Sequence, residues 1–196
     1  IVDNNPKVPD RTGAIIGGGE DPVPIMVEMG RSLERAGADF IIIPCVSAHH
    51  FIADLRRELN LPILSVLDET TELISRDHPE MRTVGLLGTK GTVQGGGFQR
   101  RLLEGGISTR VPELVDQERV MSAIYKIKGI GADSVKRESK EIMIDISNQL
   151  LLGGSEGIIA GCTEIPLVLE PEDITSPLFD PLLILARAAI KEALGK

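Results

Sequence analysis

The sequence predicts an α/β fold composed of two similar halves, each built around a parallel sheet. Short apolar runs alternate with segments of helical periodicity in both halves of the chain. A gapless internal match aligns residues 36–45 with residues 153–162, and each segment ends in one of the only two cysteines. The polar residues 76–80 separate the two halves. Because parallel strands need crossover connections, this alternation favours parallel sheets over antiparallel ones.

In the first half, residues 1–3 are interpreted as the end of a strand. The residues that follow, 4–22, are rich in glycine, proline and asparagine and predict a long loop, which in a compact fold is often functional. Helix 24–36 is predicted from apolar residues at helical spacing, and Gly37 after it suits a C-terminal cap. The remaining elements are strand 39–43, helix 47–59, strand 62–66 and helix 68–75.

The same alternation restarts after the polar break. We therefore predict a first domain over residues 1–78 and a second over residues 79–177, with the C-terminal segment 178–196 completing the first domain. The predicted elements of the second half are strand 83–87, a mostly helical segment 91–104, strand 107–111, helices 113–126 and 136–152, strand 157–160 and a C-terminal helix 181–194.

Composition and charge exclude several classes of function. The 196-residue chain has a net charge of -8, so it lacks the broad basic surface that nucleic acids or anionic membranes attract. Its apolar runs are too short to span a bilayer. Two cysteines in a chain of this size do not form a disulfide framework, and we predict a reducing, cytoplasmic compartment. Two cysteines and three histidines without close spacing also argue against a metal site.

The two cysteines are the candidate reactive groups. Cys45 and Cys162 each follow a predicted strand, at the carboxyl edge where parallel sheets bind ligands. Ser47 and Thr163 are each predicted to cap the next helix, and the free N–H groups of such a turn lower the pKa of a thiol from about 8.5 and bind carboxylates. The alternative is that each cysteine is a small buried hydrophobe. The internal match between the two segments favours a reactive pair.

The residues around both cysteines resemble the motifs of the aspartate/glutamate racemase superfamily. Pro-Cys-Val-Ser-Ala-His at residues 44–49 is similar to its Pro-Cys-Asn-Thr-x-His motif, and Gly-Cys-Thr-Glu at residues 161–164 matches its second motif. The resemblance is closest to the aspartate racemases. It extends to Asn5-Pro6, Pro9-Asp10-Arg11-Thr12, Gly85-Leu86-Leu87-Gly88-Thr89 and Ile127-Lys128-Gly129.

The resemblance implies a cofactor-independent racemase of an acidic amino acid, most simply aspartate. It implies two similar α/β domains with the site in the cleft between them, and a homodimer. Cys45 and Cys162 then act on opposite faces of the α-carbon, one removing the proton and the other returning one. Inversion of a stereocentre requires an acid and a base on opposite sides, so two thiols suit the reaction. Without an electron sink, hydrogen bonds to the α-carboxylate must stabilise the carbanion.

Further site residues are carried over from the same resemblance. Arg11 and Lys128 match the basic pair that binds the side-chain carboxylate, and the planar fork of Arg11 suits that task. His49 belongs to the first motif and is interpreted as orienting a helix start rather than transferring protons. The other predicted substrate-binding residues are Ser47, Thr89, Thr163 and Glu164.

The chain also departs from the family pattern. Val46 replaces the asparagine of the first motif, and Ser47 replaces a threonine but keeps the hydroxyl. Family members begin with another strand and a glycine-rich loop, so we expect a fragment of a longer chain whose first domain lacks its opening strand. The alternatives are a racemase of broader specificity, an isomerase or decarboxylase that uses the same cysteine positions, and a relative that only binds a small carboxylate.

Overall fold

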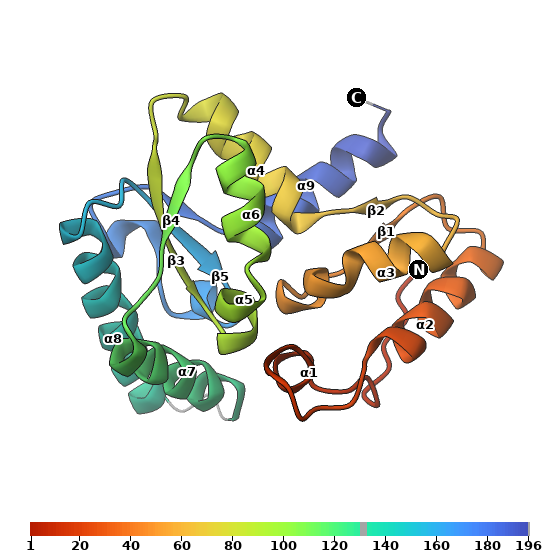
Figure 1. Ribbon diagram of the computed structural model, residues 1–196, viewed down its shortest axis with the longest axis horizontal. Helices are drawn as coiled ribbons and strands as arrows, with labels where there is room; N and C mark the ends of the chain where they lie inside the picture. The colour runs from red at the N-terminus through yellow and green to blue at the C-terminus, as the bar shows by residue number, and fades with distance from the viewer. Residues whose placement is uncertain (130–132, 196) are drawn as a thin grey trace.

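The computed structural model describes residues 1–129 and 133–195, which form an α/β fold with two parallel sheets (Figure 1). The larger sheet has the strand order β4-β3-β5-β6, and the smaller sheet pairs β1 with β2. Each pair of neighbouring strands is parallel, which confirms the predicted fold class. The strands are β1 (Ile41–Ile42), β2 (Ile63–Leu64), β3 (Thr83–Gly88), β4 (Ser108–Arg110), β5 (Ile158–Gly161) and β6 (Leu178–Phe179).

Helices cover both faces of the larger sheet. Successive residues of a strand point to opposite faces, so Leu86 and Ile159 enter one core while Leu87 and Ile158 enter the other. Burying one such side chain fully contributes about 1.5 to 3 kcal/mol. The helices are α7 (Leu114–Gly129) and α8 (Asp133–Leu152) on one face, and α4 (Val66–Asp77), α6 (Gly97–Glu104) and α9 (Pro181–Ala193) on the other.

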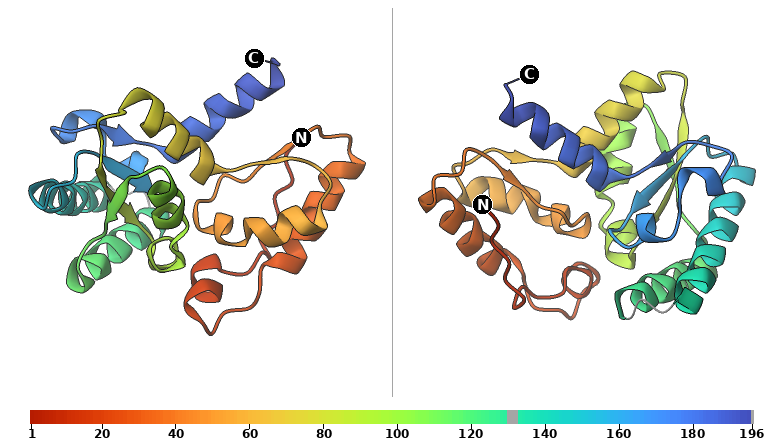
Figure 2. Two further views of the ribbon diagram at one scale, coloured as in Figure 1. Left: turned by 45° about the horizontal axis from the view of Figure 1, so that its top comes forward. Right: turned by 180° about the vertical axis from the view of Figure 1, so that it is seen from behind.

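The smaller sheet has its own core. Helix α2 (Val23–Arg35) packs against α3 (Ile52–Glu58), which continues from the 3-10 turn η1 (Ser47–Phe51). Figure 2 shows this unit beside the larger one. Its buried residues are Val27, Ile41, Leu55, Leu59 and Ile63.

A short helix from the N-terminal region joins the two units. Helix α1 (Arg11–Ile16) packs against α5 (Lys90–Gly95), and Thr12 of α1 is buried there. The approach is so close that a Cβ at Gly91 would lie 2.9 Å from the Cα of Thr12. A glycine at this position therefore allows the two helices to touch.

Some predicted elements are wrong at the N-terminus. Residues 1–3 are not a strand, and the side chains of Ile1 and Val2 are 79% and 91% exposed, so no packing fixes them. The predicted loop contains α1, whose first turn is capped by Asp10 through a 2.6 Å hydrogen bond from the Gly13 amide. A six-residue helix followed by three glycines gives too short a periodic pattern to recognise.

The C-terminal segment contacts both units. Its first residues form β6, a two-residue strand beside β5 that the sequence did not predict. Helix α9 packs against α4 and also touches β2 and β5. The division of the chain at residue 78 stays a prediction. Two further 3-10 turns, η2 (Ile165–Leu167) and η3 (Pro171–Asp173), lie between β5 and β6.

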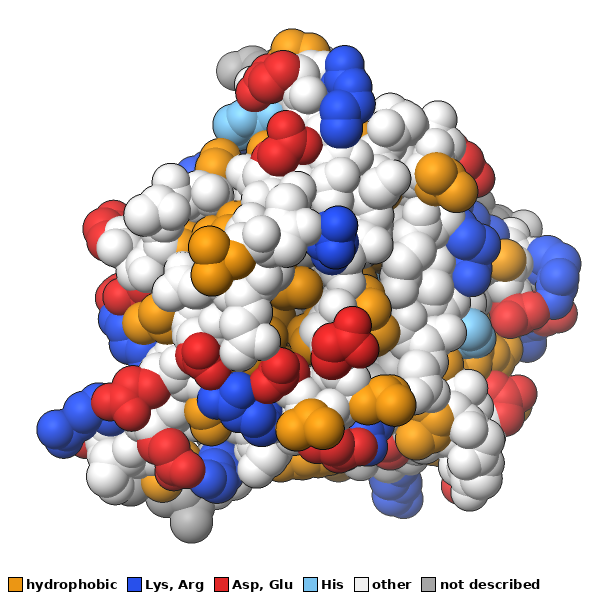
Figure 3. Space-filling view, turned by 60° about the vertical axis from the view of Figure 1, so that its left-hand side comes forward, with side chains coloured by type: hydrophobic (Ala, Val, Ile, Leu, Met, Phe, Trp, Pro, Cys, Tyr) orange, Lys and Arg blue, Asp and Glu red, His pale blue; other side chains and the backbone are white. Residues whose placement is uncertain are grey.

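Acidic and basic side chains are interspersed on the side of the molecule where α8 lies (Figure 3). Arg119 and Asp145 join α7 to α8 by a 2.7 Å ion pair, and Lys126 and Glu138 form another of the same length. Exposed pairs of this kind contribute at most about 1 kcal/mol each. None of the described helices is long and apolar enough to cross a membrane.

We expect the stability of the larger unit to depend on the buried face of α6. Leu102→Ala should lower the free energy of unfolding by about 2 to 5 kcal/mol, because Leu102 is fully buried and its loss leaves a cavity. Leu103→Ala is the matched control, since its side chain is 67% exposed, and it should change stability by less than about 0.5 kcal/mol. Denaturant unfolding of both variants measures the difference, and equal losses would contradict the packing described.

Candidate active site

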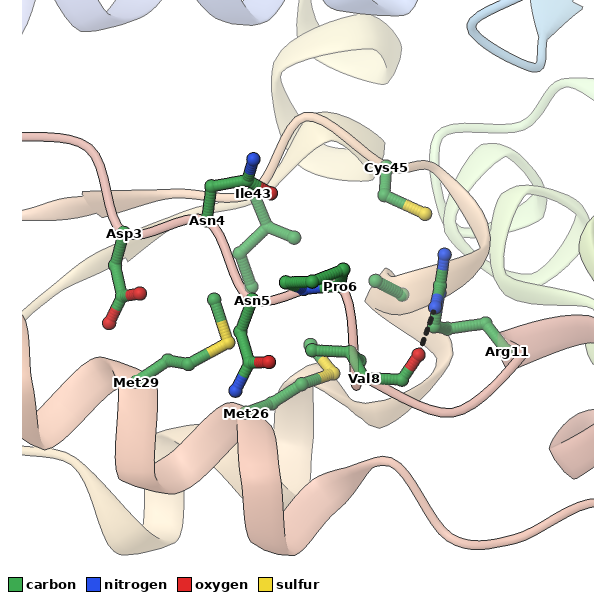
Figure 4. Close-up of a pocket in the computed structure, with 11 residues that line it drawn as sticks. Asp3, Asn4, Asn5, Pro6, Val8, Arg11, Met26, Met29, Ile43 and Cys45 are labelled. Atoms are coloured by element: carbon green, nitrogen blue, oxygen red, sulfur yellow. Dashed lines mark hydrogen bonds between the residues drawn. The ribbon is translucent and has the colours of Figure 1, made fainter. Parts of the chain in front are cut away.

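A cavity of about 380 Å³ opens beside Cys45, which follows β1 at its carboxyl end. Figure 4 shows the Cys45 thiol and the Arg11 guanidinium at one end of this cavity and Asp3 at the other. Met26 and Met29 of α2 form an apolar wall between them. The cavity has the size of a small-molecule site and combines a nucleophilic sulfur with a cation.

The guanidinium of Arg11 is fixed by its own loop. Its Nη1 donates hydrogen bonds to the carbonyl oxygens of Val8 at 3.1 Å and Pro9 at 2.7 Å. Because a guanidinium has five N–H donors, it can hold the loop and bind a carboxylate at the same time.

Ser47 lies next to the Cys45 thiol, with 3.5 Å between its Oγ and the Sγ. The prediction that Ser47 caps the following helix is wrong, because Val46 occupies the cap position and Ser47 lies inside the first turn of η1. The hydroxyl is therefore directed at the sulfur. Val46 itself is 5% exposed and packs in the apolar core, so its side chain points away from the cavity.

His49 ties the Cys45 segment to the start of α4. Its Nδ1 lies 3.0 Å from the Cys45 carbonyl oxygen, and its Nε2 accepts a 3.1 Å hydrogen bond from the Val66 amide. Since Nε2 accepts, the proton of the neutral ring is on Nδ1 and is donated to Cys45. Burial lowers the pKa of His49, which favours this neutral form. His49 thus positions backbone, as the sequence predicted.

Cys162 follows β5 and lies in a different environment. It is 8% exposed, and its Sγ donates a 3.0 Å hydrogen bond to Oε2 of Glu164. The hydroxyl of Thr163 donates to the same oxygen at 2.6 Å, so the prediction that Thr163 caps the next helix is wrong. The Nζ of Lys128 lies 3.9 Å from the other oxygen, Oε1.

The pKa of Cys162 is shifted in the direction opposite to the one expected. Burial raises it to about 12, helped by the hydrogen bond and the negative charge of Glu164. The sequence predicted a lowered pKa from the N–H groups of the turn, and the neighbouring carboxylate was not weighed. Cys162 therefore keeps its proton at neutral pH.

The N-terminus of α5 touches both cysteine segments. Thr89 caps this helix by accepting a 3.1 Å hydrogen bond from the Thr92 amide, and the Thr92 hydroxyl donates to the Gly161 carbonyl at 3.3 Å. Thr92 and Ser47 also line one narrow gap of about 10 Å³. Cys162 is not among the lining residues of the cavity at Cys45, so a substrate shared by both thiols stays a prediction.

Gln117 is a polar residue near the site that the sequence did not single out. It is buried on α7, and its Nε2 donates a 3.0 Å hydrogen bond to the carbonyl of Gly88, the residue before Thr89. A lone glutamine within a helical pattern carries no signal of such a contact. Within residues 1–129 and 133–195, no group of three or more His, Cys, Asp and Glu side chains could hold a metal ion.

Comparison with known proteins confirms the resemblance inferred from the two cysteine motifs. Residues 1–189 match the family described as Asp/Glu/Hydantoin racemase. The chain is also 25% identical over 163 residues to a broad specificity amino-acid racemase of Bacillus subtilis, which covers 83% of this chain and 68% of the relative.

Solved structures show the same similarity. The aspartate racemase of Picrophilus torridus gives a TM-score of 0.83 at 27% identity, over 98% of this chain and 78% of that one. An aspartate racemase homologue from Pyrococcus horikoshii gives a TM-score of 0.76 at 31% identity, over 88% and 74% of the two chains. At 15% identity, the glutamate racemase of Francisella tularensis shares the fold, with a TM-score of 0.64 over 88% and 63%.

The neutral state of His49 predicts how stability depends on pH. Its pKa is lowered in the folded protein, so below the ordinary value of 6.5 the unfolded chain binds a proton that the folded chain does not. Stability should therefore fall as the pH drops below about 6.5. Unfolding free energies of the wild type and of His49→Gln, measured across this range, should show a weaker pH dependence in the variant.

The adjacent exposed His50 provides the control for this measurement. His50→Gln should leave the pH dependence of stability as in the wild type. An identical pH dependence in wild type and His49→Gln would show that His49 is not the neutral bridge.

Proposed function

The chain belongs to the Asp/Glu/Hydantoin racemase family, and from this premise we propose that it racemises an amino acid with Cys45 and Cys162 as the proton-transferring pair. One observation carries the proposal: one thiol opens onto a cavity beside a cation, while the other is a buried thiol that holds its proton. A base and an acid are the two groups that inversion of a stereocentre requires.

In the proposed reaction, the Cys45 thiolate removes the α-proton of the amino acid. The electron pair of the broken C–H bond stays on the α-carbon, and Cys162 returns a proton to the opposite face. One S–H bond forms and another breaks, and no electrons leave the substrate, so the chain's own groups suffice without a cofactor. Hydrogen bonds to the α-carboxylate lower the energy of the carbanion, and Ser47 beside Cys45 is a donor for this task.

We propose aspartate as the substrate because of Arg11. Its guanidinium lies at the Cys45 end of the cavity and can bind a side-chain carboxylate bidentately. Lys128, whose side chain is 44% exposed beside Glu164, is the proposed second cation. The similarity to the aspartate racemase of Picrophilus torridus supports this choice.

A racemase of broader specificity is the second candidate. The wall formed by Met26 and Met29 favours it, because thioether side chains adapt to apolar groups of different shape. The similarity to the broad specificity racemase of Bacillus subtilis supports it as well. The two candidates differ in whether Arg11 selects the substrate.

We expect the protein to convert L-aspartate into D-aspartate in heavy water and to place deuterium at the α-carbon. Cys45→Ala and Cys162→Ala should each abolish racemisation, because each removes one of the two proton carriers. Chiral chromatography measures the enantiomers, and mass spectrometry measures the deuterium.

Leu103→Ala is the control for this experiment, since it changes an exposed side chain. Racemisation that persists in both cysteine variants would exclude the two-thiol mechanism. Binding of aspartate to the wild type without any exchange would instead indicate a protein that only binds a carboxylate.

Arg11→Met tests the substrate class. If Arg11 binds the side-chain carboxylate, the variant should lose about 10- to 100-fold in kcat/KM for aspartate, the effect of one hydrogen bond to a charged group. Its kcat/KM for an apolar amino acid such as alanine should change much less. Equal losses on both substrates would mean that Arg11 supports the loop rather than selects the substrate, and would favour broad specificity.

A further inference from the structure

The carboxylate of Glu164 is occupied by the protein's own groups. Its side chain is 14% exposed, and a single oxygen, Oε2, accepts hydrogen bonds from the thiol of Cys162 and the hydroxyl of Thr163. Lys128 lies on the side of the other oxygen, 3.9 Å away. The carboxylate therefore faces Cys162 directly.

This contact stabilises only one protonation state of the sulfur. A thiol can donate a hydrogen bond to a carboxylate, whereas a thiolate at the same 3.0 Å would place two negative charges in contact. Burial adds to the effect, because it also disfavours the charged sulfur. Lys128 opposes it weakly, since its ammonium is half exposed and lies beyond the carboxylate.

We propose that Glu164 is a positioning residue that holds Cys162 as the proton donor of the resting site, so that Cys45 performs the first proton abstraction. The meaning of this assignment for catalysis rests on the proposed racemase function. The sequence assigned Glu164 to substrate binding, and the proposal gives it a different task that it performs through Cys162.

The proposal makes the two thiols unequal although their sequence segments match. In the first turnover, the α-proton moves to the Cys45 sulfur and the Cys162 proton moves to the α-carbon. The site returns to its resting state when Cys45 loses a proton and Cys162 gains one. Glu164 favours this return, because its carboxylate again receives the S–H hydrogen bond of Cys162.

The protonation of Cys162 can be measured without turnover. In Cys45→Ala, Cys162 is the only thiol, and the ultraviolet absorption of the thiolate reports its titration. Adding Glu164→Gln should lower the pKa of Cys162 by about 1 to 3 units, because a neighbouring negative charge is removed. The pKa should stay above the ordinary value of 9.0, because burial remains. A variant lacking both cysteines supplies the baseline, including the absorption of the single tyrosine.

Glu172→Gln is the matched control, since it removes the same charge from an exposed position and should leave the titration unchanged. If Glu164→Gln does not fold, Glu164→Asp replaces it, because the shorter side chain draws the carboxylate away from the sulfur. An unshifted titration of Cys162 in the folded variant would overturn the proposal.

Catalysis gives a second readout that a purely structural residue would not change. In the Glu164→Gln variant with both cysteines, the basic limb of the pH profile of kcat/KM should move to lower pH, because that limb reports loss of the proton from the acid. A shifted titration together with absent racemisation would contradict the proposed function alone. An unshifted titration with active enzyme would contradict only the assignment of Glu164.

Discussion

The parallel pairing of β3 with β5 is the constraint on which the second half of the site depends. It places Gly88 opposite Gly161, so the chain leaves both strands at the same edge of the sheet. The residues that follow are therefore neighbours, and the cap of α5 meets the Cys162 segment through the hydrogen bond from Thr92 to Gly161. Apolar packing on both faces of the sheet holds this edge in place.

The two cysteine segments match in sequence but differ in electrostatics. Cys45 is half-buried, lies beside the hydroxyl of Ser47 and faces a cavity that contains Arg11. Cys162 is buried and donates its proton toward Glu164. An acid and a base of opposite assignment are obtained from the same residue type by changing only the neighbouring groups.

Helices and strands with strong periodicity could be predicted from the sequence, and the elements that lack it could not. The residues of α2, α8 and α9 show the spacing of a buried face, and their bounds lie within a few residues of the prediction. Helix α1 and strand β6 are too short to show a period, so only tertiary contacts reveal them. The capping roles predicted for Ser47 and Thr163 were wrong because the local backbone begins its turn one or two residues away.

By itself, the sequence determined the α/β class, the two cysteine motifs and the family, because strand and helix periods and short motifs are local properties of the chain. The tertiary structure decided the chemical state of the groups. Only the folded chain brings the thiol of Cys162 and the carboxylate of Glu164 out of water together, and only there does His49 reach the start of α4. Desolvation and hydrogen bonding set a pKa, and both depend on residues that are distant in sequence.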